Sequence, residues 1–299
     1  MKIIVEEIKR NLLFFIEKNR YTCNQFTISR YMDMKKIILL LLFPLIGNSQ
    51  KEVSPIKGDT LFMLKTEVSN EMYREFLNDL PSCEKLKNTP DSTKWRRTNS
   101  YLEPFVAYYF QHPAYNKYPV VNITQKNAKN FCKWKSKVLN NNSYGLKVEV
   151  RLPTEFEWEF AAKAGNLYAI YPWGTEKMRI EKGKNKGTIL ANYVQGKSNY
   201  QEDGATITAK IHSYFPNPFG LYNMSGNVEE MVAEKGITKG GSWNDRANLL
   251  RIDSHQKVYS ASPEVGFRYV VVILEKGNRP KKFFFKRIWN KIIRKKECF

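Results

Sequence analysis

The sequence predicts an α+β fold that combines few helices and short strands with long loops. Three segments space their apolar residues as helices do, namely residues 71–80, 120–136 and 155–164. Two segments are rich in β-branched residues and read as strands, at 148–150 and 265–274. By contrast, residues 165–250 hold almost no periodic segment longer than six residues, and aromatic residues make up 14% of the 299-residue chain. Long loops in a compact domain need contacts that hold them in place, and buried aromatic side chains can provide such contacts.

The first helix has a clear start signal. Ser69 is a favourable N-cap, and Met72, Phe76 and Leu80 then share one helical face. The polar residues 81–118 that follow are interrupted by proline and rich in aromatic side chains. We therefore expect a long irregular loop there.

The second helix is expected over residues 120–136. Thr124 can cap it, and Pro119 prevents an earlier start. Residues 139–146 are rich in asparagine and read as a turn, which leads into the short strand at 148–150.

The third helix opens at Pro153-Thr154 and runs over residues 155–164. Phe156, Phe160 and Ala164 repeat at a spacing of four, with Trp158 and Ala161 adjacent, which predicts an apolar stripe on this helix.

Residues 32–49 have the three parts of a secretory signal peptide. A basic pair at Lys35 and Lys36 precedes a short apolar run, and small residues follow it. The run is too short to span a bilayer as a stable helix, which needs about 20 residues. We expect translation to start at Met32 or Met34, so that residues 1–31 are an upstream extension. No cysteine follows the apolar run, so we expect no lipid anchor.

Histidine and cysteine usage argues against a histidine or zinc site. The chain has three scattered histidines and four cysteines without CxxC spacing. In an oxidising compartment Cys83 and Cys132 could pair. Alternatively, Cys132 is a buried residue of the second helix.

Four motifs in order carry a family resemblance. They are RLPTEFEWE at 151–159, NPFGLYNMSGNVEE at 217–230, KGGS at 239–242 and GFR at 266–268. The series resembles the formylglycine-generating enzyme family, the sulfatase-modifying-factor domain. The resemblance implies the fold of that family, a variant of the C-type lectin fold, over about residues 50–274. The family usually has Trp where this chain has Glu229.

Catalytic members of the family hold copper(I) with two cysteines that follow the Gly-Gly-Ser motif. Here those positions read Asp245 and Leu250. Copper(I) is a soft ion that needs thiolate ligands, which neither side chain supplies. The resemblance therefore implies no copper and no enzymatic activity. A formylglycine-type oxidoreductase with a rearranged site remains the alternative.

The same resemblance implies two structural calcium sites. One would use the side chains of Asn223 and Glu230 with the carbonyls of Gly226 and Val228. The other would use the side chains of Asn192 and Asp203 with the carbonyls of Tyr193 and Ala205. Calcium prefers six or more hard oxygen ligands, which such loops can offer. Alternatively, these asparagines make local turns.

Asp245 and Arg246 match the Gly-Gly-Ser-Trp-x-Asp-Arg version of the motif. That version resembles non-catalytic members such as the gliding-motility lipoproteins of the type IX secretion system, which implies a structural role. Asp245 then makes a loop contact or, the simpler expectation, a buried salt bridge with Arg251 or Arg268.

The C-terminal segment 275–299 is a basic amphipathic tail. Residues 276–299 hold ten Lys or Arg residues and one Glu, a large share of the net charge of +20. An amphipathic helix of this kind can lie on an anionic membrane, dock in a partner's groove or pack on its own domain. Its candidate contact residues are Phe285, Ile288, Trp289, Ile292, Lys286, Arg287, Lys291 and Arg294.

Together these features favour an exported, non-catalytic domain that binds a protein partner in an envelope, secretion or gliding assembly. We expect it in the periplasm or at the outer membrane, without a lipid anchor. Nucleic acid is not an expected partner, despite the charge. A lectin-like ligand-binding module is a further alternative, which a pocket near Trp243 and Tyr222 would favour.

Overall fold

The computed structural model describes residues 52–58, 60–97, 102–142, 147–195 and 205–275. The expected upstream extension and signal peptide lie outside these residues, as do Asp203 and residues 276–299 of the basic tail. Among the helices that the structure describes, none is both long and apolar enough to cross a bilayer.

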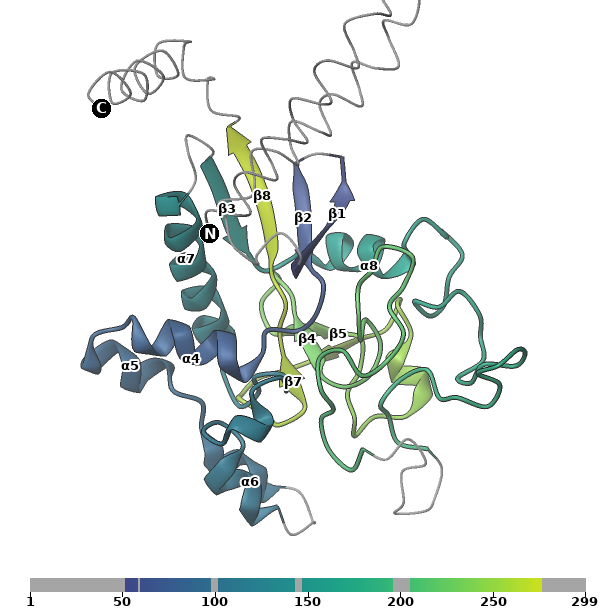
Figure 1. Ribbon diagram of the computed structural model, residues 1–299, viewed down its shortest axis with the longest axis horizontal. Helices are drawn as coiled ribbons and strands as arrows, with labels where there is room; N and C mark the ends of the chain where they lie inside the picture. Colours follow the sequence, from purple (N-terminus) through teal and green to yellow (C-terminus); the bar gives the residue numbers. More distant parts are fainter. Residues whose placement is uncertain (1–51, 59, 98–101, 143–146, 196–204, 276–299) are drawn as a thin grey trace, which may run out of the picture. The chain divides into compact units, whose positions relative to one another are not determined.

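One antiparallel sheet brings the two ends of the domain together. Its strands lie in the order β1-β2-β8-β3, with β8 between β2 and β3 (Figure 1). Val271 pairs with Phe62 on one side and with Val150 on the other. The strands are β1 (Val53–Lys57), β2 (Leu61–Leu64), β3 (Lys147–Arg151) and β8 (Val270–Glu275).

A second sheet, of short strands, lies in the order β6-β5-β4-β7, with β4 and β7 parallel. Its strands are β4 (Glu229–Met231), β5 (Ile237–Lys239), β6 (His255–Lys257) and β7 (Val265–Gly266). The single strand expected over 265–274 is thus wrong, because β7 and β8 belong to different sheets. The backbone approaches Val120 closely at Gly266, where an added Cβ would lie 2.9 Å from the Val120 carbonyl oxygen.

Three predicted helices are present with shifted ends. They are α4 (Asn70–Asn78), α7 (Gln125–Asn142) and α8 (Glu155–Lys163). The Ser69 hydroxyl accepts from the Met72 N–H, as expected for an N-cap. A capping box between Thr154 and Glu157 fixes the start of α8. The helix α7 begins after Thr124 and extends through part of the asparagine-rich segment that was expected to turn.

The expected apolar stripe of α8 is wrong in part. Phe156 is 74% exposed, whereas Trp158 and Ala161, which were expected beside the stripe, enter the core together with Ala162. Since α8 has apolar residues on both faces, spacing alone did not distinguish them. Phe160 is half-buried against Phe219, with ring centroids 6.3 Å apart.

The loop expected over 81–118 is also wrong in part, because it contains four short helices. They are α5 (Ser82–Asn88), η1 (Ser92–Arg97), α6 (Glu103–Tyr108) and η2 (Pro113–Tyr115). Tertiary contacts hold them: the Tyr73 hydroxyl donates to the Asn88 carbonyl, and the Arg74 guanidinium donates to the Phe110 carbonyl.

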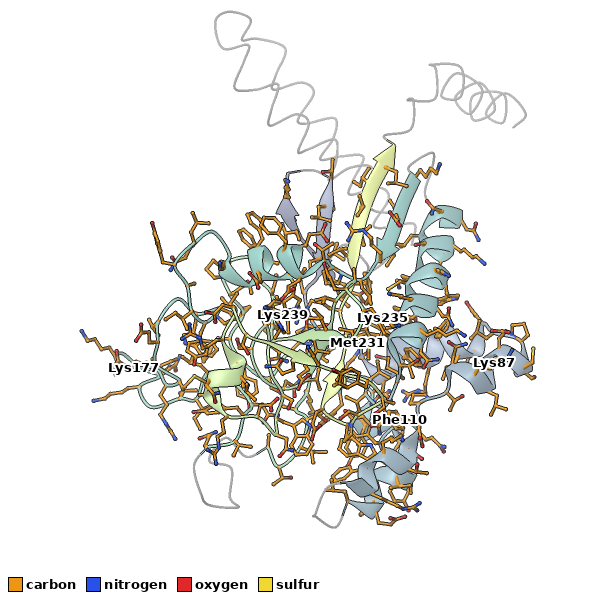
Figure 2. All side chains as sticks on the ribbon, turned by 180° about the vertical axis from the view of Figure 1, so that it is seen from behind. Lys87, Phe110, Lys177, Met231, Lys235 and Lys239 are labelled. Atoms are coloured by element: carbon orange, nitrogen blue, oxygen red, sulfur yellow. The ribbon has the colours of Figure 1, made fainter. Side chains whose placement is uncertain are left out.

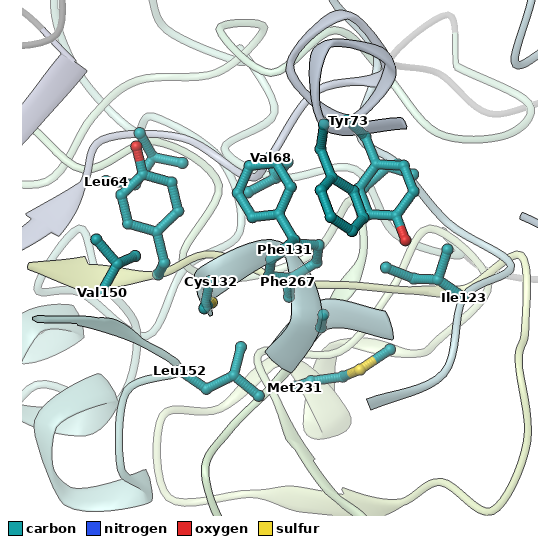
Figure 3. Close-up of a cluster of buried hydrophobic side chains, with 14 of the residues drawn as sticks. Leu64, Val68, Tyr73, Ile123, Phe131, Cys132, Val150, Leu152, Met231 and Phe267 are labelled. Carbon is teal, nitrogen blue, oxygen red and sulfur yellow. The ribbon is translucent and has the colours of Figure 1, made fainter. Parts of the chain in front are cut away.

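The main core lies between α4, α7 and the first sheet (Figure 3). Phe131 of α7 stacks against Tyr73 and meets Phe267 edge to face. Cys132 is buried in this core, whereas Cys83 is exposed, and both are free thiols. The Cys83–Cys132 disulfide is therefore wrong, and the reading of Cys132 as a buried helix residue is confirmed.

Candidate functional site

The loop that follows Gly240-Gly241 places Asp245 at the first family cysteine position. One Asp245 carboxylate oxygen accepts from both the N–H (2.8 Å) and the hydroxyl (2.7 Å) of Ser242. The Asp245 carbonyl accepts from the Val194 N–H at 2.8 Å. Asp245 therefore closes a turn and ties it to the neighbouring loop.

The salt bridge expected for Asp245 is wrong. Arg251 pairs with Asp253 at 2.7 Å, and Arg268 pairs with Glu230 at 2.5 Å. The nearby hydroxyl and amide of Ser242 satisfy the Asp245 carboxylate locally, so it needs no guanidinium. This agrees with the other expectation, a loop contact.

Leu250, at the second family cysteine position, is a core residue. It is fully buried at the end of η3 (Ala247–Leu250) and packs with Tyr171, Ile189 and Tyr193. The site of a reactive thiol pair is thus filled by an aliphatic side chain and a turn-forming carboxylate.

Glu229 is the unusual residue beside this loop. It is buried in β4, where it accepts a hydrogen bond from the Thr238 hydroxyl. Burial raises the pKa of Glu229 to about 8; the Thr238 hydrogen bond opposes this shift, and the nearby carboxylates of Asp245 and Glu264 add to it. The Glu229 carboxyl therefore holds its proton to a higher pH than an ordinary glutamate does.

The raised pKa of Glu229 gives a testable pH dependence. The folded protein holds this proton up to about pH 8, whereas the unfolded chain releases it near the ordinary value of 4.5. The bound proton stabilises the folded protein, and this contribution to the free energy of unfolding is lost as the pH rises from 4.5 to about 8. We expect Glu229→Gln to leave the free energy of unfolding nearly unchanged at pH 4 and to raise it by about 3–5 kcal/mol at pH 9. Urea unfolding at both pH values measures this.

The matched control is Glu181→Gln, because Glu181 is exposed. It should change the free energy of unfolding little at either pH. If the free energy of unfolding changed equally with pH in the wild type and in Glu229→Gln, Glu229 would be ionised in the folded protein.

Glu230, the next residue, forms a buried ion pair. Its two oxygens accept from Nε (2.6 Å) and Nη2 (2.5 Å) of Arg268, and the Trp158 indole donates to the same carboxylate at 2.7 Å. Arg268 also donates to the carbonyls of Leu64 and Tyr222. This pair connects both sheets with the 217–230 motif.

A buried amide network brings the two expected calcium segments together. The Asn192 side chain donates to the Asn227 side chain at 3.3 Å, and the Asn227 N–H donates to the Asn192 carbonyl at 2.9 Å. Asn223 and Asn227 both donate to the carboxylate of Glu67. Burial raises the pKa of Glu67 to about 7, which Arg268 partly opposes.

Two of the expected calcium ligands have amide oxygens suited to a cation. Oδ1 of Asn192 and Oδ1 of Asn223 are buried and accept no hydrogen bond. Glu230 differs, because Arg268 and Trp158 already use its oxygens, so an ion there would share the carboxylate. Gly226 and Val228 lie buried in the same motif.

The remaining predicted positions lie close by. Tyr193 is buried beside Leu250, and Ala205 is half-buried at the start of the described segment 205–275. The tail residues and Asp203 fall outside the described residues.

Lys239 was not predicted as a structural residue. Its ammonium is fully buried, 2.7 Å from Glu159 and 3.3 Å from Glu155 of α8. Figure 2 shows Lys239 near the centre of the view, whereas the exposed Lys87 and Lys177 lie at its periphery. The spacing of four between the two glutamates was the only local signal.

Comparisons with known proteins show the family of this chain. The model of the family described as sulfatase-modifying factor enzyme 1-like domain matches residues 43–273. Formylglycine-generating enzyme from Mus musculus is 35% identical over 122 residues, which are 40% of this chain and 28% of the relative. The enzyme of the same name from Thermomonospora curvata is 37% identical over 120 residues, 39% of this chain and 33% of the relative.

A third relative carries a different name. Inactive C-alpha-formylglycine-generating enzyme 2 from Bos taurus is 32% identical over 168 residues, 51% of this chain and 50% of the relative. The matches thus span half or less of the length of each of these three relatives. Since the family model covers well over half of the chain, this protein belongs to the sulfatase-modifying factor enzyme 1-like domain family.

Proposed function

We propose that this chain is an exported, non-catalytic sulfatase-modifying-factor-like domain that binds a protein partner in the cell envelope. The observation that carries the non-catalytic reading is the pair of residues at the family cysteine positions. Leu250 is fully buried in the core, and the Asp245 carboxylate accepts a hydrogen bond from Ser242. The relative named as inactive supports the same reading, because it is similar over about half of this chain.

Copper binding tests the absence of the enzymatic site. We expect no copper(I) binding and no oxidation of a cysteine-containing peptide by the wild-type chain, since neither Asp245 nor Leu250 offers a thiolate. The double variant Asp245→Cys with Leu250→Cys restores the cysteine pair and serves as the positive control in a copper(I) competition titration. Tight copper binding or peptide oxidation by the wild type would contradict this reading and support the alternative, an oxidoreductase with a rearranged site.

Co-purification from the native envelope tests the partner-binding role. A tag inserted at residues 143–146, between α7 and β3, leaves the described elements intact. We expect stoichiometric recovery of envelope, secretion or gliding components by mass spectrometry. Recovery of the chain alone, from the same membranes, would contradict the proposal.

Variants of the tail then separate a protein groove from a membrane surface. Deletion of residues 280–299 should abolish co-purification if the tail is the contact. Ile288→Ser with Ile292→Ser removes apolar contacts, and Lys291→Gln with Arg294→Gln removes charge. Binding in a protein groove should be weakened most by the isoleucine substitutions. Binding to an anionic membrane should be weakened strongly by the charge substitutions and by salt.

We further propose that structural calcium binds beside the buried amide network. The orphaned oxygens of Asn192 and Asn223 support this, with Tyr193, Asp203 and Ala205 at one site and Gly226, Val228 and Glu230 at the other. A ligand present at 100 times its dissociation constant stabilises the folded state by about 2.7 kcal/mol.

Calcium addition should therefore raise the midpoint of thermal unfolding by about 5–10 °C over EDTA-treated protein. Asn223→Ala and Asn192→Ala should each reduce this increase. The exposed turn residue Asn185 provides the control variant Asn185→Ala, which should keep it. Equal midpoints in calcium and EDTA would mean that the amide oxygens serve the fold without an ion.

A further inference from the structure

A cavity of about 520 Å³ lies where the second sheet meets the start of α7. Its lining comes from residues 124–126, 235–237 and 258–260, together with Met231. These segments are the start of α7, the turn into β5 and the chain that leaves β6. Trp243 and Tyr222, near which a pocket would favour the lectin-like alternative, do not line it. The volume is that of a small-ligand site.

The cavity has an apolar lining that rests on the main core. Met231 is 1% exposed and packs in that core, and Figure 2 shows it beside Lys235. Ile237, Val258 and Tyr259 add to the lining, and Tyr259 is 88% exposed. Because core side chains are closely packed, this floor is preformed and suits an apolar group.

Two lysines give the cavity a positive charge. Lys126 and Lys235 both line it and are exposed. Neither ammonium group has a hydrogen bond or an ion pair within the described part of the chain. The carboxylate of Glu234, which precedes Lys235, accepts from the Glu155 N–H of α8 at 3.0 Å. The two lysines are therefore available to a carboxylate of a ligand.

Strand β6 offers an open edge directly before the cavity. It is the outer strand of the second sheet, and its neighbour on the other side is β5. The Val258 N–H donates to the Gly236 carbonyl at 2.9 Å. Since main-chain groups alternate in direction along a strand, those of His255 and Lys257 point away from β5.

These outward main-chain groups are open for pairing. In the residues that the structure describes, no hydrogen bond uses the N–H or carbonyl of His255 or Lys257, and both residues are exposed. An extended peptide can add to such an edge as a further strand. Because β6 has only three residues, this pairing alone provides few hydrogen bonds, and the adjoining cavity must contribute as well.

The position of the cavity selects one end of such a peptide. The lining residues 258–260 follow the last residue of β6, so a peptide that runs parallel to β6 reaches the cavity with its C-terminal residue. That residue carries both an apolar side chain and the terminal carboxylate. It therefore matches the apolar lining and the two lysines together.

We propose that β6 and this cavity bind the C-terminus of an extended peptide that ends in an apolar residue. The peptide main chain pairs with His255 and Lys257, the last side chain enters the cavity, and the terminal carboxylate pairs with Lys126 and Lys235. The proposal adds a second contact surface, apart from the tail, to the proposed partner binding. Purified chain and synthetic peptides test it, so its failure would leave the co-purification result unaffected.

Isothermal titration of the full chain with the peptide acetyl-Thr-Val-Thr-Val-Leu tests the carboxylate. We expect one saturable site, and at least about tenfold weaker binding when the terminal carboxylate is replaced by an amide. N-acetyl-leucine, which keeps the apolar side chain and the carboxylate but has no strand, should also bind at least about tenfold more weakly.

Two N-methylated peptides test the strand pairing. The methyl group is placed on one of two successive residues, because only one of these N–H groups faces β6. One peptide should bind at least about tenfold more weakly than the parent peptide, and the other should bind nearly as well.

Matched variants locate the site on the protein. Lys126→Gln with Lys235→Gln should remove the preference for the free carboxylate over the amide, and Lys133→Gln with Lys137→Gln, both exposed on α7, should keep it. Tyr259→Ala should weaken binding, whereas Tyr168→Ala, at a site that is 94% exposed and outside the cavity, should not.

Four results would each overturn the proposal. They are the absence of saturable binding, equal binding of the acid and the amide, equal effects of the test and control variants, and binding of N-acetyl-leucine as tight as that of the peptide. The last result would show a site for small carboxylic acids, to which the edge of β6 contributes nothing.

Discussion

Replacing Arg268 with alanine should destabilise the fold by about 3–5 kcal/mol, because it leaves a buried carboxylate unpaired. The Glu230 side chain is 1% exposed, and in the variant only the Trp158 indole would still donate to it. The carbonyls of Leu64 and Tyr222 would lose their donor as well. Since small domains are stable by only about 5–15 kcal/mol, the variant should show a much lower urea midpoint.

The exposed pair of Arg251 and Asp253 supplies the control. Its side chains are 41% and 63% exposed, so Arg251→Ala should cost at most about 1 kcal/mol. The double variant Arg268→Met with Glu230→Leu should be more stable than Arg268→Ala alone, because no charge is left buried. Similar losses for Arg251→Ala and Arg268→Ala would show that Glu230 reaches solvent in the folded state.

The sequence predicted those helices whose start signals are local. Ser69 and Thr154 are visible as caps because the groups they bond lie three residues away. Within 81–118, α5 and α6 have no side-chain cap hydrogen bond, and short helices of this segment depend on distant partners. Tyr73 reaches the carbonyl of Asn88, and η1 is anchored by Trp95, which is fully buried.

The second sheet was not predictable from periodicity, because β4, β5 and β6 have three residues each. A strand of that length shows at most one alternation of apolar and polar residues. In helix α8 the sequence showed apolar residues on two faces, the spacing-of-four series with Phe156 and the adjacent Trp158 and Ala161. Spacing alone could not show that Phe156 is exposed and Trp158 is buried.

In the candidate site, too, some residues could be assigned from the sequence and others could not. Asp245 and Leu250 could be assigned from a sequence motif, and the structure gives each a physical role. The partners of Asn223 and Asn227 could not be assigned, because the Glu67 carboxylate that joins them lies 156 and 160 residues away in sequence. Contacts of such separation arise only from the fold.

Gly226 lies where one expected calcium segment packs closely against the other. Its backbone has a φ of +77°, and an added Cβ would lie 2.4 Å from the carbonyl oxygen of Asn192 and 3.2 Å from the Cβ of Ala191. Neither neighbour can swing away, since the Asn192 carbonyl also accepts from the Asn227 N–H. We expect Gly226→Ala to cost more than about 3 kcal/mol, the sum of left-handed strain and steric displacement.

Gly220→Ala separates these two costs. Gly220 has nearly the same φ, +74°, but an added Cβ there would meet no atom within 4 Å. It should therefore cost only the strain of a left-handed residue, about 1–2 kcal/mol, in the same urea titration. If calcium binds at these segments, Gly226→Ala should also weaken the calcium-dependent rise of the thermal midpoint, and Gly220→Ala should keep it. Equal losses of stability in the two variants would mean that the contact between Gly226 and Asn192 relaxes freely, because backbone strain alone would then explain both.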